Sequence, residues 1–293
     1  MALSKEELAS LMDNTPEEAE ETPKPEPVAE VAQEEDDEEF EAPVQLTPDN
    51  VKSIGGLPIQ RVGDMPHRYI KFLIFADPGA GKTWLTGSAS VVEEMSPVLL
   101  LDIDGGDLTL FRTFPDVEVV RVKDWKSMQS LYKDLRKGDF EYKTFGVDSL
   151  TELQKFNMDQ LMFEAWKADH DKDRDKPGWD EFNKNGNQTR RVVRLFRDLP
   201  VNVIFTCHVM YKQNKEGQII GRMPDLTGKL SRQVPGFIDT VGYLYPKVID
   251  GEVVRLMQTF SDGKTIAKDR SGRLPKIVRN PDMQMIYNAY FGK

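Results

Sequence analysis

The residues best placed to do chemistry lie between Ala76 and Trp84, where the chain reads ADPGAGKTW. An apolar run at residues 70–75 precedes them, and this order predicts a β-strand that ends in a tight turn and opens a helix. Backbone N–H groups in such a turn converge on one point, where they bind phosphate oxygens. We therefore expect a nucleotide-binding loop made of Asp77, Pro78, Gly79, Ala80, Gly81, Lys82, Thr83 and Trp84.

The last residues of this motif carry its more demanding chemistry. Lys82 would reach the β- and γ-phosphates, and the Thr83 hydroxyl would complete the coordination shell of Mg²⁺. The usual pattern GxxxxGK[ST] begins with Gly, whereas Ala76 stands there in this chain, and a small residue is enough at that point. The chain has no Asn-Lys-x-Asp string of the kind that reads guanine. The expected ligands are therefore ATP and Mg²⁺.

Hydrolysis also needs an acid that orients the metal and a group that activates water. Asp148 is the candidate metal ligand beside Thr83, and the alternative is that it only caps the helix that follows. Asp104 is the candidate base for the attacking water, although Asp102 could take that role and either could be a turn residue. His208 is a candidate sensor of the γ-phosphate, or it is a structural histidine.

Alternating strands and helices must position these residues. Strands are predicted at 59–62, 69–75, 98–104, 117–122, 142–148 and 201–207, and helices at 82–94, 125–137, 151–168 and 179–199. This alternation indicates an α/β fold with a mainly parallel sheet covered by helices on both faces. Because parallel strands end at one edge of a sheet, the candidate residues are expected to meet there. Two further predicted hairpins, at 209–222 and 240–260, indicate an antiparallel extension.

The first part of the chain has a different composition. Residues 1–45 contain 16 acidic residues and two lysines, a net charge of −14, while the whole chain of 293 residues carries −10. Residues 46–293 therefore carry a net charge of +4. A segment with so much charge and so little apolar surface is expected to be disordered. The predicted organisation is an acidic tail at 1–48 followed by one domain at 49–293. The tail is a solvated segment, a partner-docking peptide or a DNA-mimicking autoinhibitor.

The cysteine content and the hydropathy of the chain indicate its cellular compartment. The single cysteine, Cys207, excludes an internal disulfide and fits a reducing cytoplasm. No apolar run approaches the roughly 20 residues that a membrane helix needs. We therefore expect a cytoplasmic protein with no membrane partner.

Six strings in this order resemble those of RecA-like ATPases of phages, namely the core-only Sak-type single-strand annealing proteins or recombinases. They are ADPGAGKT, LLLDIDGG, FGVDSLTEL, NVIFTCH, PDLTGKL and FIDTVGYL, and the resemblance spans residues 55–273. It implies a RecA-like P-loop core, an AAA-type ATPase activity, single-stranded DNA as partner and self-association as a ring or filament. Asp104 stands where that family usually has Glu, and His208 matches the sensor position.

The resemblance also implies residues that act between subunits and on DNA. Lys268 and Arg270 are similar to a basic motif that enters the neighbouring subunit's nucleotide site, although an exposed basic loop is the alternative. Loops at 170–186 and 209–237 would face DNA. The candidate DNA-binding residues are Lys172, Arg174, Lys176, Tyr211, Lys212, Lys215, Arg222, Lys229 and Arg232.

The resemblance favours an ATPase stimulated by single-stranded DNA and assembly, acting in phage recombination, annealing or replication-linked repair. Two other functions stay open. One is an ATP switch that recruits a replisome component or a single-stranded-DNA-binding protein through the acidic tail. The other is a helicase or helicase loader, although the chain offers no additional helicase domain.

Overall fold

The computed structural model describes residues 53–59 and 69–292. The acidic tail, the predicted boundary at 48/49 and most of the predicted strand at 59–62 lie outside these residues, and the described Ile59 is not in a strand. Before it, β1 (Ser53–Ile54) pairs antiparallel with β2 (Leu57–Pro58). None of the described helices is long and apolar enough to cross a membrane.

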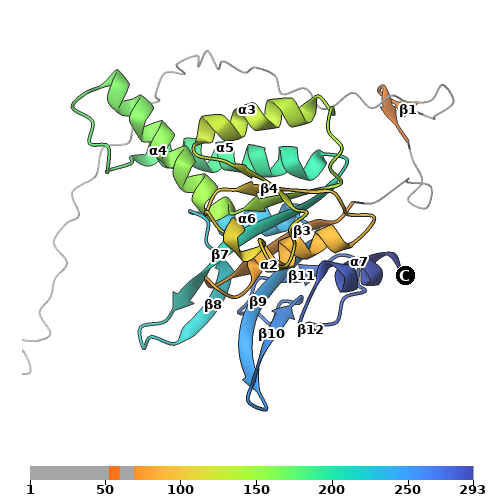
Figure 1. The fold of residues 1–293 in the computed structure, drawn as a ribbon. Helices are drawn as coiled ribbons and strands as arrows, with labels where there is room; N and C mark the ends of the chain where they lie inside the picture. Colours follow the sequence, from red (N-terminus) through yellow and green to blue (C-terminus); the bar gives the residue numbers. More distant parts are fainter. Residues whose placement is uncertain (1–52, 60–68, 293) are drawn as a thin grey trace, which may run out of the picture. The chain divides into compact units, whose positions relative to one another are not determined.

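One ten-stranded sheet organises residues 69–292 (Figure 1). Its strands are β3 (Lys71–Ala76), β4 (Val98–Asp102), β5 (Glu118–Arg121), β6 (Thr144–Asp148), β7 (Asn202–Gln213), β8 (Ile219–Pro224), β9 (Thr240–Ile249), β10 (Glu252–Gln258), β11 (Lys268–Asp269) and β12 (Ile277–Arg279). The order is β12-β10-β9-β3-β7-β6-β4-β5, with β8 on β7 and β11 on β9. The strands from β9 to β5 in this order pair in parallel, and β8, β10, β11 and β12 are antiparallel additions.

Helices cover both faces of the sheet. They are α2 (Lys82–Gly87), η2 (Ser88–Val91), η3 (Asp107–Thr109), α3 (Trp125–Arg136), α4 (Leu150–Ala168), α5 (Trp179–Asp198), α6 (Leu230–Phe237) and α7 (Met283–Phe291). Apolar residues of α3 to α6 form one core with the sheet, and those of α2, η2 and α7 form a second core. The expected class is confirmed: an α/β fold with a mainly parallel sheet, helices on both faces and an antiparallel extension.

The two cores explain the unbroken apolar run before the nucleotide-binding loop. Side chains alternate between the faces of a strand, and both faces of β3 are covered. Leu73 and Phe75 belong to the core under α3 to α6, whereas Phe72 and Ile74 belong to the core under α2 and α7. All four are fully buried. A strand buried on both sides reads as a continuous apolar segment.

Two expectations about element boundaries were wrong. The helix expected at 82–94 ends at Gly87 and continues as one turn of 3₁₀-helix. Gly87 and Ser88 have low helix propensity, and the Ser88 hydroxyl donates to the carbonyl of Leu85. The break expected after Cys207 is also absent from the described chain, because β7 exchanges its partners β3 and β6 for β8 and runs on without interruption. Cys207 is buried within it.

Candidate nucleotide-binding site

The nucleotide-binding loop has the expected geometry of a strand, a turn and a helix. β3 ends at Ala76 and α2 begins at Lys82. Gly79 and Gly81 adopt φ values of 77° and 104°, a region that residues with a side chain seldom enter. The Lys82 amine lies 3.3 Å from the carbonyl oxygens of both Ala76 and Asp77, to which it donates. Burial lowers its pKa, against the effect of the nearby Asp148 and Asp104.

Asp148 faces this loop from the end of β6. One carboxylate oxygen accepts a hydrogen bond of 2.6 Å from the Thr83 hydroxyl, and the other accepts one from the hydroxyl of Thr206 in β7. The helix that follows is capped by Ser149, whose hydroxyl accepts from the backbone N–H of Glu152. The alternative role of Asp148, as the cap of that helix, is therefore wrong.

The surroundings of Thr83 and Asp148 fit a Mg²⁺ ion. A hydroxyl and a carboxylate converge there, and Mg²⁺ prefers oxygen ligands. Gly106 leaves room beside them, since a Cβ at this position would lie 3.3 Å from Thr83 Oγ1 and 3.7 Å from Asp148 Oδ2. Burial raises the pKa of Asp148, and a cation at this place would favour the charged carboxylate.

The structure separates the two acids at the end of β4, where Asp102 is the last residue of the strand and Asp104 follows it. One oxygen of Asp102 accepts from the backbone N–H groups of Gly105 and Gly106, each at 2.9 Å, so this buried carboxyl group shapes the turn. Asp104 lies in the nucleotide site instead. Its Oδ1 accepts from the backbone and hydroxyl of Ser149, and its Oδ2 lies 3.1 Å from Nε2 of His208. The candidate base and the candidate sensor are therefore in direct contact.

Strand β7 contacts three acidic residues of the site. Thr206 bonds to Asp148 and His208 pairs with Asp104, while the Tyr211 hydroxyl donates to the carboxylate of Asp77 at 2.5 Å. The sequence did not single out Thr206, although its spacing of two from His208 on a strand was an available signal. Tyr211, one of the candidate DNA-binding residues, contacts the nucleotide loop through this hydroxyl. His208 lies within β7, not at its end as expected.

The sequence matches a protein-family model described as an AAA domain over residues 68–271. The chain belongs to this family. It is accordingly an AAA-type P-loop ATPase. No curated protein matches the chain. Among solved structures, a KaiC-like protein from the hyperthermophilic archaeon Pyrococcus horikoshii OT3 is similar at 12% identity and a TM-score of 0.33, over 64% of this chain and 76% of that chain. The assignment rests on the family match.

Lys268 and Arg270 lie in the AAA domain but far from its own nucleotide loop. Lys268 pairs with Val241, which pairs with Leu73, three residues before the end of β3. The backbone of Arg270 is bonded to Asp239, which is bonded to the first residue of β3. At about 3.3 Å per residue, Arg270 is some 17 Å from the nucleotide end of that strand. Its guanidinium pairs with Asp239 at 3.1 Å.

The first candidate DNA loop has most of its cations engaged within the domain. It connects α4 to α5, where Lys172 pairs with Glu181 at 3.1 Å and Lys176 with Asp173 at 2.9 Å. The Arg174 guanidinium lies over the rings of Phe163 and Trp166 on α4. These contacts leave little free positive charge in this loop.

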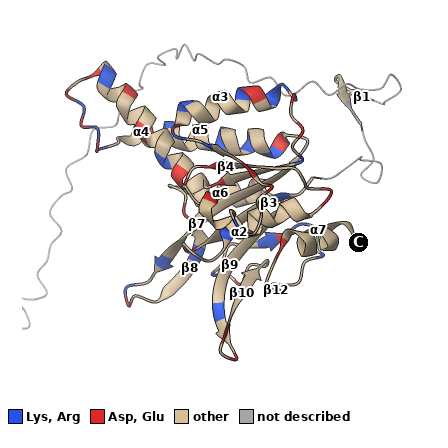
Figure 2. Cartoon of the chain, viewed as in Figure 1, with Lys and Arg blue, Asp and Glu red and all other residues tan. Residues whose placement is uncertain are grey.

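The second candidate DNA segment is the hairpin of β7 and β8, which projects from the lower left of the sheet (Figure 2). It begins after His208, the partner of Ala76 at the end of β3. Lys212 and Lys215 are exposed on it and have no carboxylate partner among the described residues. Arg222 returns toward the domain and lies over the ring of Tyr243. Lys229 and Arg232, also candidates, are exposed at the start of α6.

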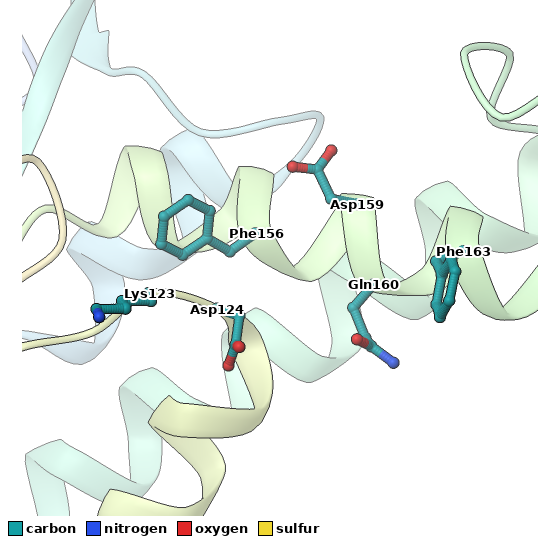
Figure 3. A pocket seen from close by; sticks show the side chains of 6 residues that line it. All are labelled: Lys123, Asp124, Phe156, Asp159, Gln160 and Phe163. Atoms are coloured by element: carbon teal, nitrogen blue, oxygen red, sulfur yellow. The ribbon is translucent and has the colours of Figure 1, made fainter.

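A separate shallow pocket of about 290 Å³ lies between α4 and the start of α3 (Figure 3). Its lining residues are Lys123, Asp124, Phe156, Asp159, Gln160 and Phe163. Asp124 already accepts from the backbone and hydroxyl of Ser127 as the N-cap of α3. Gln160 donates to Glu164. We assign no ligand to this pocket.

Proposed function

We propose that this AAA-type ATPase hydrolyses ATP under the control of single-stranded DNA, in phage recombination, annealing or replication-linked repair. One observation carries the proposal: β7 contacts Asp148, Asp104 and Asp77 and then continues directly into a cationic hairpin. A polymer bound to the hairpin would therefore pull on the strand that holds the acids of the nucleotide site. The phage role is supported by the resemblance of the sequence to Sak-type proteins.

In this proposal each side chain of the site has a defined task. The loop amides and Lys82 bind the phosphates, while Thr83 and Asp148 hold Mg²⁺, which would offset the charge of the phosphates. Asp104 orients and polarises the attacking water, and its contacts with Ser149 and His208 fix the direction of its carboxylate. His208 contacts Asp104 and lies within β7, so a movement of the Asp104 carboxylate during hydrolysis would be transmitted to that strand.

The hairpin suits a polymer whose sequence is not read. Lys212 and Lys215 can contact phosphates, and the neighbouring Ile219 and Ile220 are 38% and 40% exposed and offer apolar contact to bases. Binding of this kind is independent of base sequence and weakens strongly as salt increases.

The position of Lys268 and Arg270 favours action on another subunit. Arg270 lies level with the opposite end of β3 from the nucleotide loop. The backbone of Lys268 lies level with the middle of β3, and its amine donates to the carbonyl of Gly236, so neither side chain reaches its own site in this structure. In an assembly of copies stacked in the same direction, that end would face the neighbour's nucleotide. Positive charge supplied in this way stabilises the transition state and makes hydrolysis depend on assembly.

The test is the ATPase rate with and without single-stranded DNA, over a range of protein concentrations. We expect DNA and concentration each to raise the rate, Lys82→Ala to abolish it, and a Lys212→Ala/Lys215→Ala variant to lose most of the DNA response. Lys126→Ala, an exposed lysine on α3, is the matched control. A rate that is the same with and without DNA at all concentrations overturns the proposal.

A further inference from the structure

Arg255 reaches the nucleotide-binding loop from a strand that the sequence did not connect with it. The residue lies on β10, beyond β9 from the loop strand β3. A Cβ on Gly81 would lie 2.8 Å from Nε and 3.2 Å from Cδ of Arg255. The arginine side chain therefore occupies the space beside the last glycine of the loop, directly before Lys82.

The backbone of Arg255 is fixed, while its charge has no anionic partner in the described part of the chain. Its N–H donates to the side chain of Asn280 at 3.0 Å, and its carbonyl accepts from the N–H of Asn280 at 2.7 Å. The guanidinium carbon lies 5.4 Å from the ring centroid of Trp84, whose ring also packs against Phe114. No carboxylate within the described ranges pairs with this guanidinium. A cation is thus held against the loop by an aromatic ring.

We propose that Arg255 binds the phosphates of the nucleotide from within the same subunit, an inference that rests on the proposed binding of ATP. The loop amides must approach phosphate oxygens closely, and the guanidinium lies in contact with that loop. A guanidinium presents paired N–H donors that match phosphate oxygens, and its face stays free to rest on an aromatic ring. When the nucleotide binds, the guanidinium of Arg255 would move from the ring of Trp84 toward the phosphates.

Gly81 then has a second role besides its backbone conformation. A Cβ at Gly81 would lie only 2.8 Å from Nε of Arg255, which is too close for a carbon atom, so a side chain here would displace the arginine from its present place. The glycine therefore lets the loop take its left-handed turn and lets the arginine approach the phosphates.

The experiment measures the affinity of Arg255→Ala and Arg255→Lys for ATP and for inorganic tripolyphosphate. We expect Arg255→Ala to weaken both about 10- to 100-fold, with a smaller loss for Arg255→Lys, which keeps the charge without the paired donors. Arg279→Ala, an exposed arginine on the neighbouring β12, is the control and should bind as the wild type does. Thermal unfolding checks that each variant is folded.

Trp84 supplies a second readout. ATP should change the tryptophan fluorescence of the wild type, and Trp84→Phe or Arg255→Ala should remove that change. The inference is overturned if Arg255→Ala binds ATP as tightly as the wild type, or if it weakens ATP but not tripolyphosphate, since the contact would then be with the nucleoside. Failure of the wild type itself to bind ATP would instead overturn the proposed function on which the inference rests.

Discussion

Asp148 combines a functional requirement with a cost to stability. Its side chain is 1% exposed, and burial raises its pKa above the ordinary value. The folded state therefore holds this proton more tightly than the unfolded state, so the free energy of unfolding falls as pH rises through the raised pKa. We expect Asp148→Asn to raise the thermal stability of the nucleotide-free protein at pH 7 and to lower ATP hydrolysis by about 100-fold or more. A variant that loses both stability and activity would contradict this account.

Thr206 adjusts the same carboxyl group. Its hydroxyl hydrogen bond favours the charged form of Asp148. Thr206→Val should therefore raise the pKa of Asp148 further and move the acidic limb of the pH–rate profile to higher pH. Thr189→Val removes a similarly buried hydroxyl, one that bonds to Asn185 on α5, and should leave this limb in place. An unchanged profile in Thr206→Val would show that the bond does not tune the site.

At the level of single residues, local patterns predicted the groups that bind phosphate and metal. Lys82, Thr83 and Asp148 follow directly from strand ends and motif spacing, and their convergence is what the structure shows. Arg255 could not be found in this way, and for Thr206 the spacing of two from His208 was the one available signal. Their importance comes from contacts with residues far away in sequence, on strands whose pairing no local pattern reveals.

At the level of elements, β7 joins the nucleotide site to the hairpin through Tyr211. Its hydroxyl donates to Asp77 and lies 3.3 Å from the hydroxyl of Tyr243. We expect Tyr211→Phe to reduce the stimulation by single-stranded DNA several-fold, measured as the ratio of rates with and without DNA. Tyr245→Phe, which keeps the ring stacked on Tyr243, is the control. Full stimulation in Tyr211→Phe would exclude this contact as the link.

The same strand shows why element boundaries were harder to predict than element types. β7 stays extended past His208 because β8 takes over its backbone hydrogen bonds, and this exchange depends on a hairpin that forms later in the chain. α2 ends early at Gly87, where a side chain would come within 2.5 Å of Leu110 and 2.9 Å of Phe114. Strand pairing therefore sets the boundary of β7, whereas low helix propensity and tertiary packing act together at the end of α2.

For the whole molecule, the free energy of unfolding is expected to depend on pH through Lys71. This residue begins β3, at the end of the strand remote from the nucleotide loop. Its amine is buried and donates to the carbonyls of Leu199 and Val201 at 2.7 and 2.5 Å. Burial lowers its pKa to about 7 from 10.5. The unfolded state therefore binds more protons between these values, and the free energy of unfolding should rise by up to about 1.4 kcal/mol per pH unit.

Urea unfolding at several pH values between 7 and 10 measures this dependence. Lys71→Met should make the curve flatter over that range and should stabilise the protein most near pH 7. Lys126→Met, on the surface of α3, should leave the slope unchanged. An equally steep slope in Lys71→Met would assign the dependence to other groups.

Assembly is tested by mixing two inactive variants. Lys82→Ala lacks a working loop, and Lys268→Ala/Arg270→Ala lacks the basic residues that we place in a neighbour's site. If these residues act between subunits, the mixture should recover part of the wild-type ATPase rate, because some interfaces join an intact loop to intact cations. No recovery, in mixtures shown to co-assemble, would argue against action between subunits.

At this scale the sequence predicted the layers but not the order of the strands. Alternating strands and helices were enough to indicate a parallel sheet covered on both faces. Strand β7 lies between β3 and β6, and this position brings Thr206 to Asp148 and His208 to Asp104. The position depends on packing between segments that are far apart in the sequence.

Cys207 has a practical consequence for the study of this ATPase. It is the sole cysteine, it is fully buried in β7, and burial raises the pKa of its thiol. Because alkylating dyes react with thiolates at the surface, we expect Cys207 in the folded protein not to react with them. A single cysteine introduced at Glu216, in the turn of the β7–β8 hairpin, would carry a fluorophore without background labelling. The hairpin's movement could then be followed in real time during each cycle of ATP turnover.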